Sequence, residues 1–131
     1  DSCCTCYENE TELNNQEEIP ENATPCNAET VSGGQGVTET IHDLGTNNGV
    51  VTITYDMENV PDKMEVFYEG KIIASTKEIK GNYNGYVGEN NNAGCCGSIS
   101  FNYKYNIDRF CTVVISGGDE TVWNYTLGCP I

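Results

Sequence analysis

Basic residues are scarce in this chain, which has six Lys and Arg against twenty Asp and Glu and a formal net charge of −14 at pH 7. Nucleic-acid binding needs a basic stripe for the phosphates, so the charge balance argues against a nucleic-acid partner. The same balance argues against an anionic membrane surface. A chain this acidic is expected to have a soluble surface that repels other copies of itself, or a surface that interacts with cations.

Long apolar runs are also lacking, and none approaches the roughly 20 residues that a membrane-spanning helix needs. The sequence therefore predicts no membrane insertion. No signal peptide is seen at its beginning. If the protein is secreted, we expect a signal to have been removed and Asp1 to begin the mature chain.

Patterns that carry catalysis are missing as well. The chain has one histidine, His42, and no pair of CxxC motifs, which disfavours a zinc site. The CxxC of Cys3 and Cys6 lacks the βαβ context of a redox motif. No GxSxG motif occurs, and no two carboxylates stand out as a glycosidase pair. We therefore expect no enzyme, and we expect His42 on a strand surface.

Cysteine, in contrast, is abundant, with eight residues in a chain of 131. An even number at this density predicts a disulfide framework formed in an oxidising compartment, and hence a secreted, extracellular protein. The residues expected in disulfides are Cys3, Cys4, Cys6, Cys26, Cys95, Cys96, Cys111 and Cys129.

Composition divides the chain into two unlike parts. Residues 1–30 carry eight acids and no Lys or Arg, and their few apolar side chains cannot offset the entropy of ordering them. They are predicted to form an acidic, Cys-rich N-terminal arm that is stapled by disulfides. Residues 31–36, VSGGQG, are expected to be a linker, and residues 37–131 a single domain.

The second part alternates apolar and polar residues over short stretches separated by polar turns, with no long helical period. This pattern predicts an all-β fold, an antiparallel β-sandwich of the jelly-roll or Ig-like kind. The strands are expected at residues 37–44, 50–57, 63–69, 71–76, 98–105, 110–116 and 121–127. Residues 81–97 form a long Gly- and Asn-rich connection. A loop of this length is expected to be held by disulfides or to carry a function.

Strand alternation also suggests one disulfide. Cys111 and Cys129 each lie on the apolar face of one of the last two strands, so they could pair inside the core. Cys95 and Cys96 would then accept two bridges from the arm, because adjacent cysteines rarely pair with each other. A further bridge within the arm would complete the set. The cysteine pattern fits two alternatives: the disulfides join the arm to its own domain, or they join it to the domain of a neighbouring chain.

Three sequons, at Asn9, Asn22 and Asn124, predict N-linked glycans on a secreted glycoprotein. Asn124 is the informative one, since Trp123 and Tyr125 should point inward and leave Asn124 facing solvent. In an unglycosylated exoprotein these motifs would have no meaning.

Two acidic turns are weak candidates for calcium, the only cofactor that the sequence suggests. One is DMENVPD with Asp56, Glu58 and Asp62, and the other contains Asp119 and Glu120. Their spacing matches no EF-hand loop, and acids at turns are usually solvated. Separately, three tyrosines suited to stacking on sugars or to protein contacts are Tyr7, Tyr83 and Tyr86.

The stretch GVVTITYDMENVPDKMEVFYEGKIIAST, followed by GSISFNY and CTVVISGGDETVWNYTLGCP, resembles β-sandwich modules appended to secreted bacterial and protist proteins. The resemblance covers about residues 36–131, and its most specific piece is residues 61–66. It implies a jelly-roll-like fold with a carbohydrate-binding, adhesive or accessory role, and it brings no catalytic residues.

Together these features predict a structural subunit of an extracellular glycoprotein assembly. We expect it to self-associate into a homopolymer, a filament built through the N-terminal arm and disulfides. The alternative is a monomeric, lectin-like module that binds carbohydrate or calcium through the face of residues 81–97.

Overall fold

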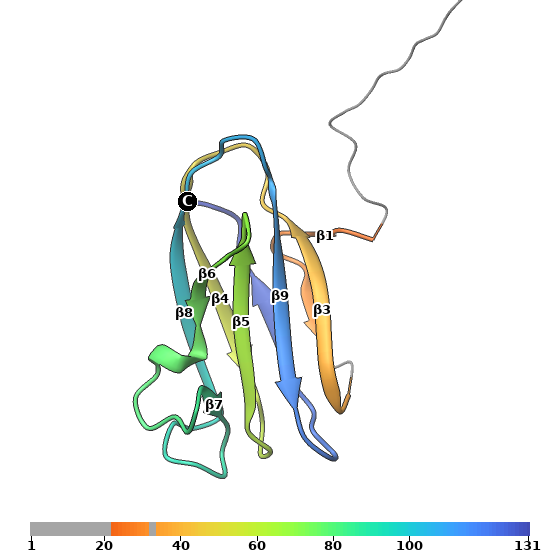
Figure 1. Ribbon diagram of the computed structural model, residues 1–131, viewed down its shortest axis with the longest axis vertical. Coiled ribbons are helices and arrows are strands. Elements are labelled where there is room, and N and C mark those ends of the chain that lie inside the picture. The colour runs from red at the N-terminus through yellow and green to blue at the C-terminus, as the bar shows by residue number, and fades with distance from the viewer. Residues whose placement is uncertain (1–21, 32–33) are drawn as a thin grey trace, which may run out of the picture.

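The computed structural model describes residues 22–31 and 34–131, and this part of the chain is all-β (Figure 1). Its elements are β1 (Thr24–Pro25), β2 (Glu29–Val31), β3 (Gly36–Asp43), β4 (Gly49–Asp56), β5 (Asp62–Tyr68), β6 (Lys71–Ser75), the 3-10 turn η2 (Thr76–Glu78), β7 (Tyr86–Val87), β8 (Cys96–Tyr103), β9 (Phe110–Gly117) and β10 (Asn124–Leu127). Within these residues no helix is long and apolar enough to cross a membrane.

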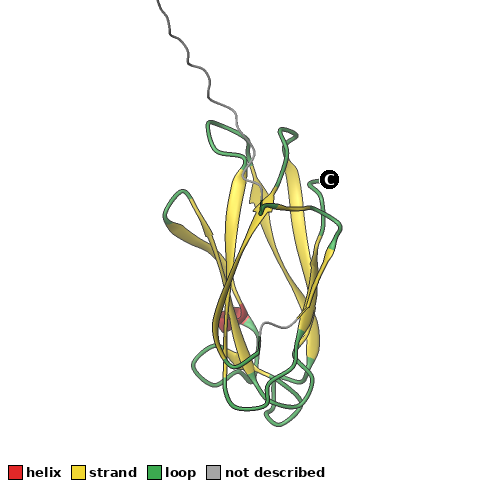
Figure 2. Ribbon diagram, turned by 90° about the vertical axis from the view of Figure 1, so that its right-hand side faces the viewer, coloured by secondary structure: helices red, strands yellow, loops and turns green. Residues whose placement is uncertain are grey.

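The strands form two sheets, which Figure 2 shows as two layers. Sheet A has the order β1-β3-β9-β5-β6, with β7 paired to β5, and sheet B has the order β2-β10-β4-β8. All pairings are antiparallel except the short parallel contact of β1 with β3. The expected all-β, two-sheet architecture is thus confirmed.

One apolar core lies on the inner faces of the two sheets. In β4, the side chains alternate between buried Val51, Ile53 and Tyr55 and exposed Thr52 and Thr54. This is the two-residue period that a half-buried strand requires. The same alternation in β5, β8, β9 and β10 supplies most of the remaining core.

Each of the seven expected strands is present, within three residues of its predicted bounds. Three short strands were not expected. β7 lies inside the long Gly- and Asn-rich connection. β1 comes from the segment predicted as an arm, and β2 spans the end of that segment and the first residue of the expected linker. β1 extends sheet A and β2 extends sheet B, so residues 24–31 belong to the two-sheet body.

Segments near both ends of the described chain are tied to the interior strands β10 and β4 of sheet B. Asn27 donates its N–H to the Leu127 carbonyl over 2.6 Å, and Ile131 exchanges backbone hydrogen bonds with Val50 at 2.8 and 3.1 Å. A disulfide joins Cys26 to Cys129 at a sequence separation of 103. The body is therefore closed covalently close to its C-terminus.

Candidate site on the outer face of sheet B

A row of four side chains crosses the outer face of sheet B from one edge to the other. The register places Val31 opposite Asn124, Asn124 opposite Asp56, and Asp56 opposite Cys96. Directly opposed residues of neighbouring strands point to the same face and lie close together. None of the four is buried, so the row faces solvent.

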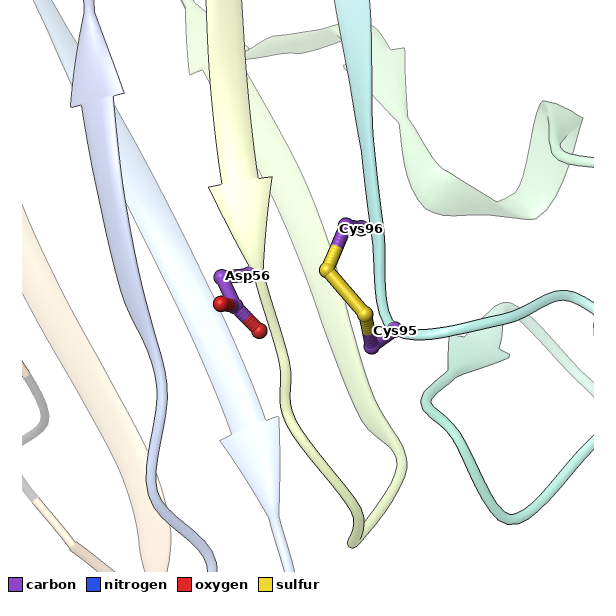
Figure 3. Close-up of side chains that lie close together, drawn as sticks. All are labelled: Asp56, Cys95 and Cys96. Carbon is purple, nitrogen blue, oxygen red and sulfur yellow. A yellow bond between two sulfur atoms is a disulfide. The ribbon is translucent and has the colours of Figure 1, made fainter.

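At the end of this row, Cys95 and Cys96 are joined to each other in a vicinal disulfide. Figure 3 shows this pair where β8 begins, beside Asp56 at the end of β4. A carboxylate oxygen of Asp56 and the two sulfur atoms all lie within 4.8 Å of one another. Among the described residues this is the only group of three His, Cys, Asp or Glu side chains so close together.

Backbone pairing holds this group in place. Met57, just past the end of β4, donates its N–H to the Cys95 carbonyl over 2.8 Å. Asp56 Oδ1 accepts the N–H of Glu58 at 2.9 Å, which fixes the carboxylate at the turn after β4. Cys96 is exposed, while Cys95 and Asp56 are half-buried. The disulfide is therefore accessible from solvent, and its position depends on the strand register as well as on the S–S bond.

The predicted Cys111–Cys129 disulfide is wrong, because Cys129 pairs with Cys26 and Cys111 is a thiol. Cys129 lies beyond the end of β10, where its N–H donates to Asn27 Oδ1 at 3.1 Å and brings the neighbouring Cys26 close. Cys111 lies in the other sheet, opposite His42, and is only 3% exposed. Burial raises the pKa of its thiol to about 12, so it is an unreactive core side chain.

The vicinal pairing also overturns the expectation that Cys95 and Cys96 would bridge to the arm. The general preference for larger Cα separations in disulfides does not hold here, since the Cα atoms are 3.7 Å apart. Cys3, Cys4 and Cys6 lie outside the described residues.

The three sequons differ in their setting. Asn22 is exposed, and Asn124 is half-buried on the outer face of sheet B, as the alternation of β10 predicted. Asn9 lies outside the described residues. Asn124 stands next to Asp56 in register, so a glycan there would begin beside the candidate site.

The calcium candidates are not brought together by the fold. Asp56 belongs to the row described above, whereas Asp62 is fully buried and its Oδ1 accepts a hydrogen bond from Thr121. The other oxygen of Asp62 has no hydrogen-bond partner. Burial raises the pKa of Asp62 to about 6, and the Thr121 hydrogen bond opposes that rise. A buried carboxyl of this kind favours its neutral form and is a poor cation ligand.

The other acidic candidates lie at the surface. Glu58 and Glu120 line a shallow pocket together with Asn59, Val60 and Val122. Asp119, directly before Glu120 in the same turn, is exposed. No group of three carboxylates with ligand atoms within 4.8 Å of one another is found among residues 22–31 and 34–131.

His42 was expected on a strand surface, and that expectation is wrong. Its side chain is 0% exposed, and Nε2 lies 2.7 Å from Tyr125 Oη across the core. Desolvation lowers the pKa of His42 to about 4. In β3, the apolar Ile41 lies on the face opposite His42, which made that opposite face look like the one turned to the core. Thr38, Thr40 and His42 share the face that is turned inward, and their two-residue alternation was the signal for it.

The loop tyrosines also separate. Tyr83 is 74% exposed, while Tyr86 is half-buried with Lys63 Nζ 5.6 Å from its ring centroid. The two are joined by an isolated β-bridge. Tyr7 lies outside the described residues. Only Tyr83 presents an open ring in this loop.

Compared with known protein families, curated proteins and solved structures, the chain matches none.

Proposed function

We propose that this protein is a secreted structural subunit whose chains are joined by disulfides from the N-terminal segment into an extracellular homopolymer. We also infer that its two sheets pack as a jelly roll. The orders β2-β10-β4-β8 and β3-β9-β5-β6 are those of eight antiparallel strands wound as two Greek keys. This fold class serves many functions, so the fold alone does not indicate one. The cysteines and the open edge of β8 support the proposed function.

Cysteine pairing is the observation that carries the proposal. Two disulfides use four of the eight cysteines, and Cys111 is a buried thiol. Three cysteines are left, Cys3, Cys4 and Cys6. Three thiols cannot all pair among themselves, so at least one must pair outside these 131 residues or stay free. An odd cysteine in a secreted protein indicates intermolecular pairing or a reactive thiol.

An open sheet edge supports self-association. β8 pairs with β4 on one side and with no described strand on the other. Gly128 donates its N–H to the Thr52 carbonyl, so Thr52 directs its backbone groups away from β8. Its register partner Ser100 therefore turns its own N–H and C=O toward the open edge. No charged residue or proline protects β8, although such residues commonly protect edges.

The proposal is tested on native protein by non-reducing gel electrophoresis and sedimentation velocity. We expect a ladder of covalent oligomers that collapses to monomer on reduction. A chain with Cys3, Cys4 and Cys6 all changed to Ser should lose the ladder. The matched control, Cys95→Ser with Cys96→Ser, should keep it. A wild-type chain that is monomeric in both assays would refute the homopolymer.

A second candidate, a carbohydrate-binding module, is favoured by the outer face of sheet B. In a chain with net charge −14, this face carries a patch of exposed hydroxyl and amide side chains: Thr52, Thr54, Ser98, Ser100 and Asn102. The Thr52 and Ser100 hydroxyls lie 3.1 Å apart. Neutral hydrogen-bonding groups spread over one sheet face suit a neutral polysaccharide. Co-sedimentation with insoluble neutral glucans, lost in Thr54→Lys, would favour this role over assembly.

A further inference from the structure

The vicinal disulfide occupies the one place in the described chain where two sulfur ligands and a carboxylate converge. We propose that reduction of Cys95–Cys96 creates a binding site for a thiophilic divalent cation, Zn²⁺ or Cd²⁺, with the two thiolates and Asp56 as ligands. The inference does not depend on the proposed assembly, because it concerns a disulfide that the assembly does not use.

The backbone keeps the three side chains together when the S–S bond is absent. Cys96 is paired to Asp56 in the β4–β8 ladder, and the Cys95 carbonyl accepts the Met57 N–H. The Asp56↔Cys96 pair ends a run of eight register pairs that begins at Gly49↔Tyr103, and the Met57–Cys95 hydrogen bond extends it by one residue. Opening one disulfide between adjacent residues releases little chain, because it closes almost no loop.

The Asp56 carboxylate is available as a ligand. Its Oδ1 accepts a single hydrogen bond, from the Glu58 N–H, and no described group bonds Oδ2. Asp56 is half-buried at the surface, so an ion can approach it from solvent. Figure 3 shows the Asp56 carboxylate at the end of β4 beside the sulfur atoms of Cys95 and Cys96 at the start of β8.

The redox step balances as a thiol–disulfide exchange. A small dithiol reductant gives up two electrons and two protons and becomes a cyclic disulfide. The Cys95–Cys96 bond breaks, and the two protons and electrons produce two thiols. Metal binding then displaces both protons, since the thiolate is the ligand. In the oxidised protein the sulfurs are bonded to each other, so the ion and the disulfide exclude one another.

The donor set decides the class of metal. Two thiolates and one carboxylate suit a tetrahedral Zn²⁺ or Cd²⁺ ion, with water in the fourth position. Calcium is excluded at this site because it takes six to eight oxygen ligands. The bound ion would bridge the end of β4 and the start of β8 in place of the covalent link between Cys95 and Cys96.

The test uses the full chain with Cys3, Cys4 and Cys6 changed to Ser, so that no other surface thiols bind metal. Mild dithiol treatment is followed by mass spectrometry of the alkylated protein, and only samples with Cys26–Cys129 intact are titrated. Cd²⁺ is the probe, measured by equilibrium dialysis and by the thiolate-to-metal charge-transfer band. We expect one Cd²⁺ per reduced chain and none per oxidised chain.

Two variants locate the ion. Cys95→Ser with Cys96→Ser should abolish both the bound Cd²⁺ and the ultraviolet band. Asp56→Asn should keep the band and weaken affinity about tenfold, whereas the exposed control Asp119→Asn should change neither. A reduced chain with a native circular dichroism spectrum that binds no more Cd²⁺ than the double-serine variant would overturn the proposal. Equal affinity in Asp56→Asn would remove Asp56 from it.

Discussion

Two buried ionisable side chains, His42 and Asp62, oppose each other in their effect on stability with pH. Each is 0% exposed, and each has one nitrogen or oxygen without a hydrogen-bond partner. Burial moves the pKa of His42 down to about 4 and that of Asp62 up to about 6. Both shifts favour the neutral side chain in the folded state, so their effects on stability run in opposite directions between pH 4 and pH 6.

For His42, the unfolded chain binds a proton near pH 6.5 and the folded chain only near pH 4. The stability that comes from neutral His42 is therefore fully present above pH 6.5 and is lost as pH falls toward 4. The loss is on the order of 3 kcal/mol. His42→Gln should remove this dependence, and urea unfolding across pH 4–7 measures it. If His42→Gln left the pH dependence unchanged, folding would not shift the pKa of His42.

For Asp62, the folded state binds a proton near pH 6 and the unfolded chain near pH 3.8. Stability should therefore fall as pH rises from about 4 to 6, by an amount comparable to the His42 effect. Asp62→Asn should abolish that fall, while the exposed Asp119→Asn serves as the control. Because the two effects offset each other, we expect the wild type to show a weaker pH dependence than either single variant.

At the scale of single elements, the open edge of β8 leads to a prediction about non-covalent association, which can be tested separately from the disulfides. Ser100→Pro removes an N–H that faces away from β4, so the β4–β8 ladder keeps its hydrogen bonds. We expect the variant to unfold at nearly the same urea concentration as the wild type and to lose non-covalent association in sedimentation.

The control for this edge is Thr54→Lys, which changes the same face on the central strand β4. If strands add to the edge, association should survive in Thr54→Lys and fail in Ser100→Pro. If association fails only in Thr54→Lys, the contact is through the face of sheet B and not through its edge.

Much of the strand pattern could be predicted from the sequence because each strand has one clearly apolar face. Val51, Ile53 and Tyr55 in β4 are an example. β1 and β2 could not be predicted, since two or three residues show no period and their pairing depends on the distant β3 and β10. His42 was misplaced because a buried polar residue looks like a surface one until its partner, Tyr125, is known.

The candidate site was hidden for a related reason. Asp56 and Cys96 are forty residues apart, and only the register of β4 against β8 makes them neighbours. Their residue types suggested calcium for the first and a bridge to the arm for the second. Cysteine counts alone also gave no connectivity, because eight cysteines allow 105 pairings.

At the scale of the whole molecule, the Cys26–Cys129 disulfide should dominate stability among the covalent links described. It closes a loop with a sequence separation of 103, whereas Cys95–Cys96 has a separation of 1. Replacing Cys26 and Cys129 by Ser should lower the free energy of unfolding by roughly 4–5 kcal/mol through the entropy of the unfolded chain. Urea unfolding measures this difference.

The matched variant for that experiment is Cys95→Ser with Cys96→Ser, which we expect to change stability by less than about 1 kcal/mol. Similar losses in the two variants would show that local packing, and not loop closure, accounts for the effect of the longer-range disulfide.

The same disulfide has a mechanical consequence. A chain pulled at its two ends transmits tension along the shortest covalent path, and here that path runs through the sulfur atoms of Cys26 and Cys129. The strands β2 to β10 lie between these residues and are outside the load path. While the S–S bond is intact, these strands would be shielded from a force applied at the two ends of the chain.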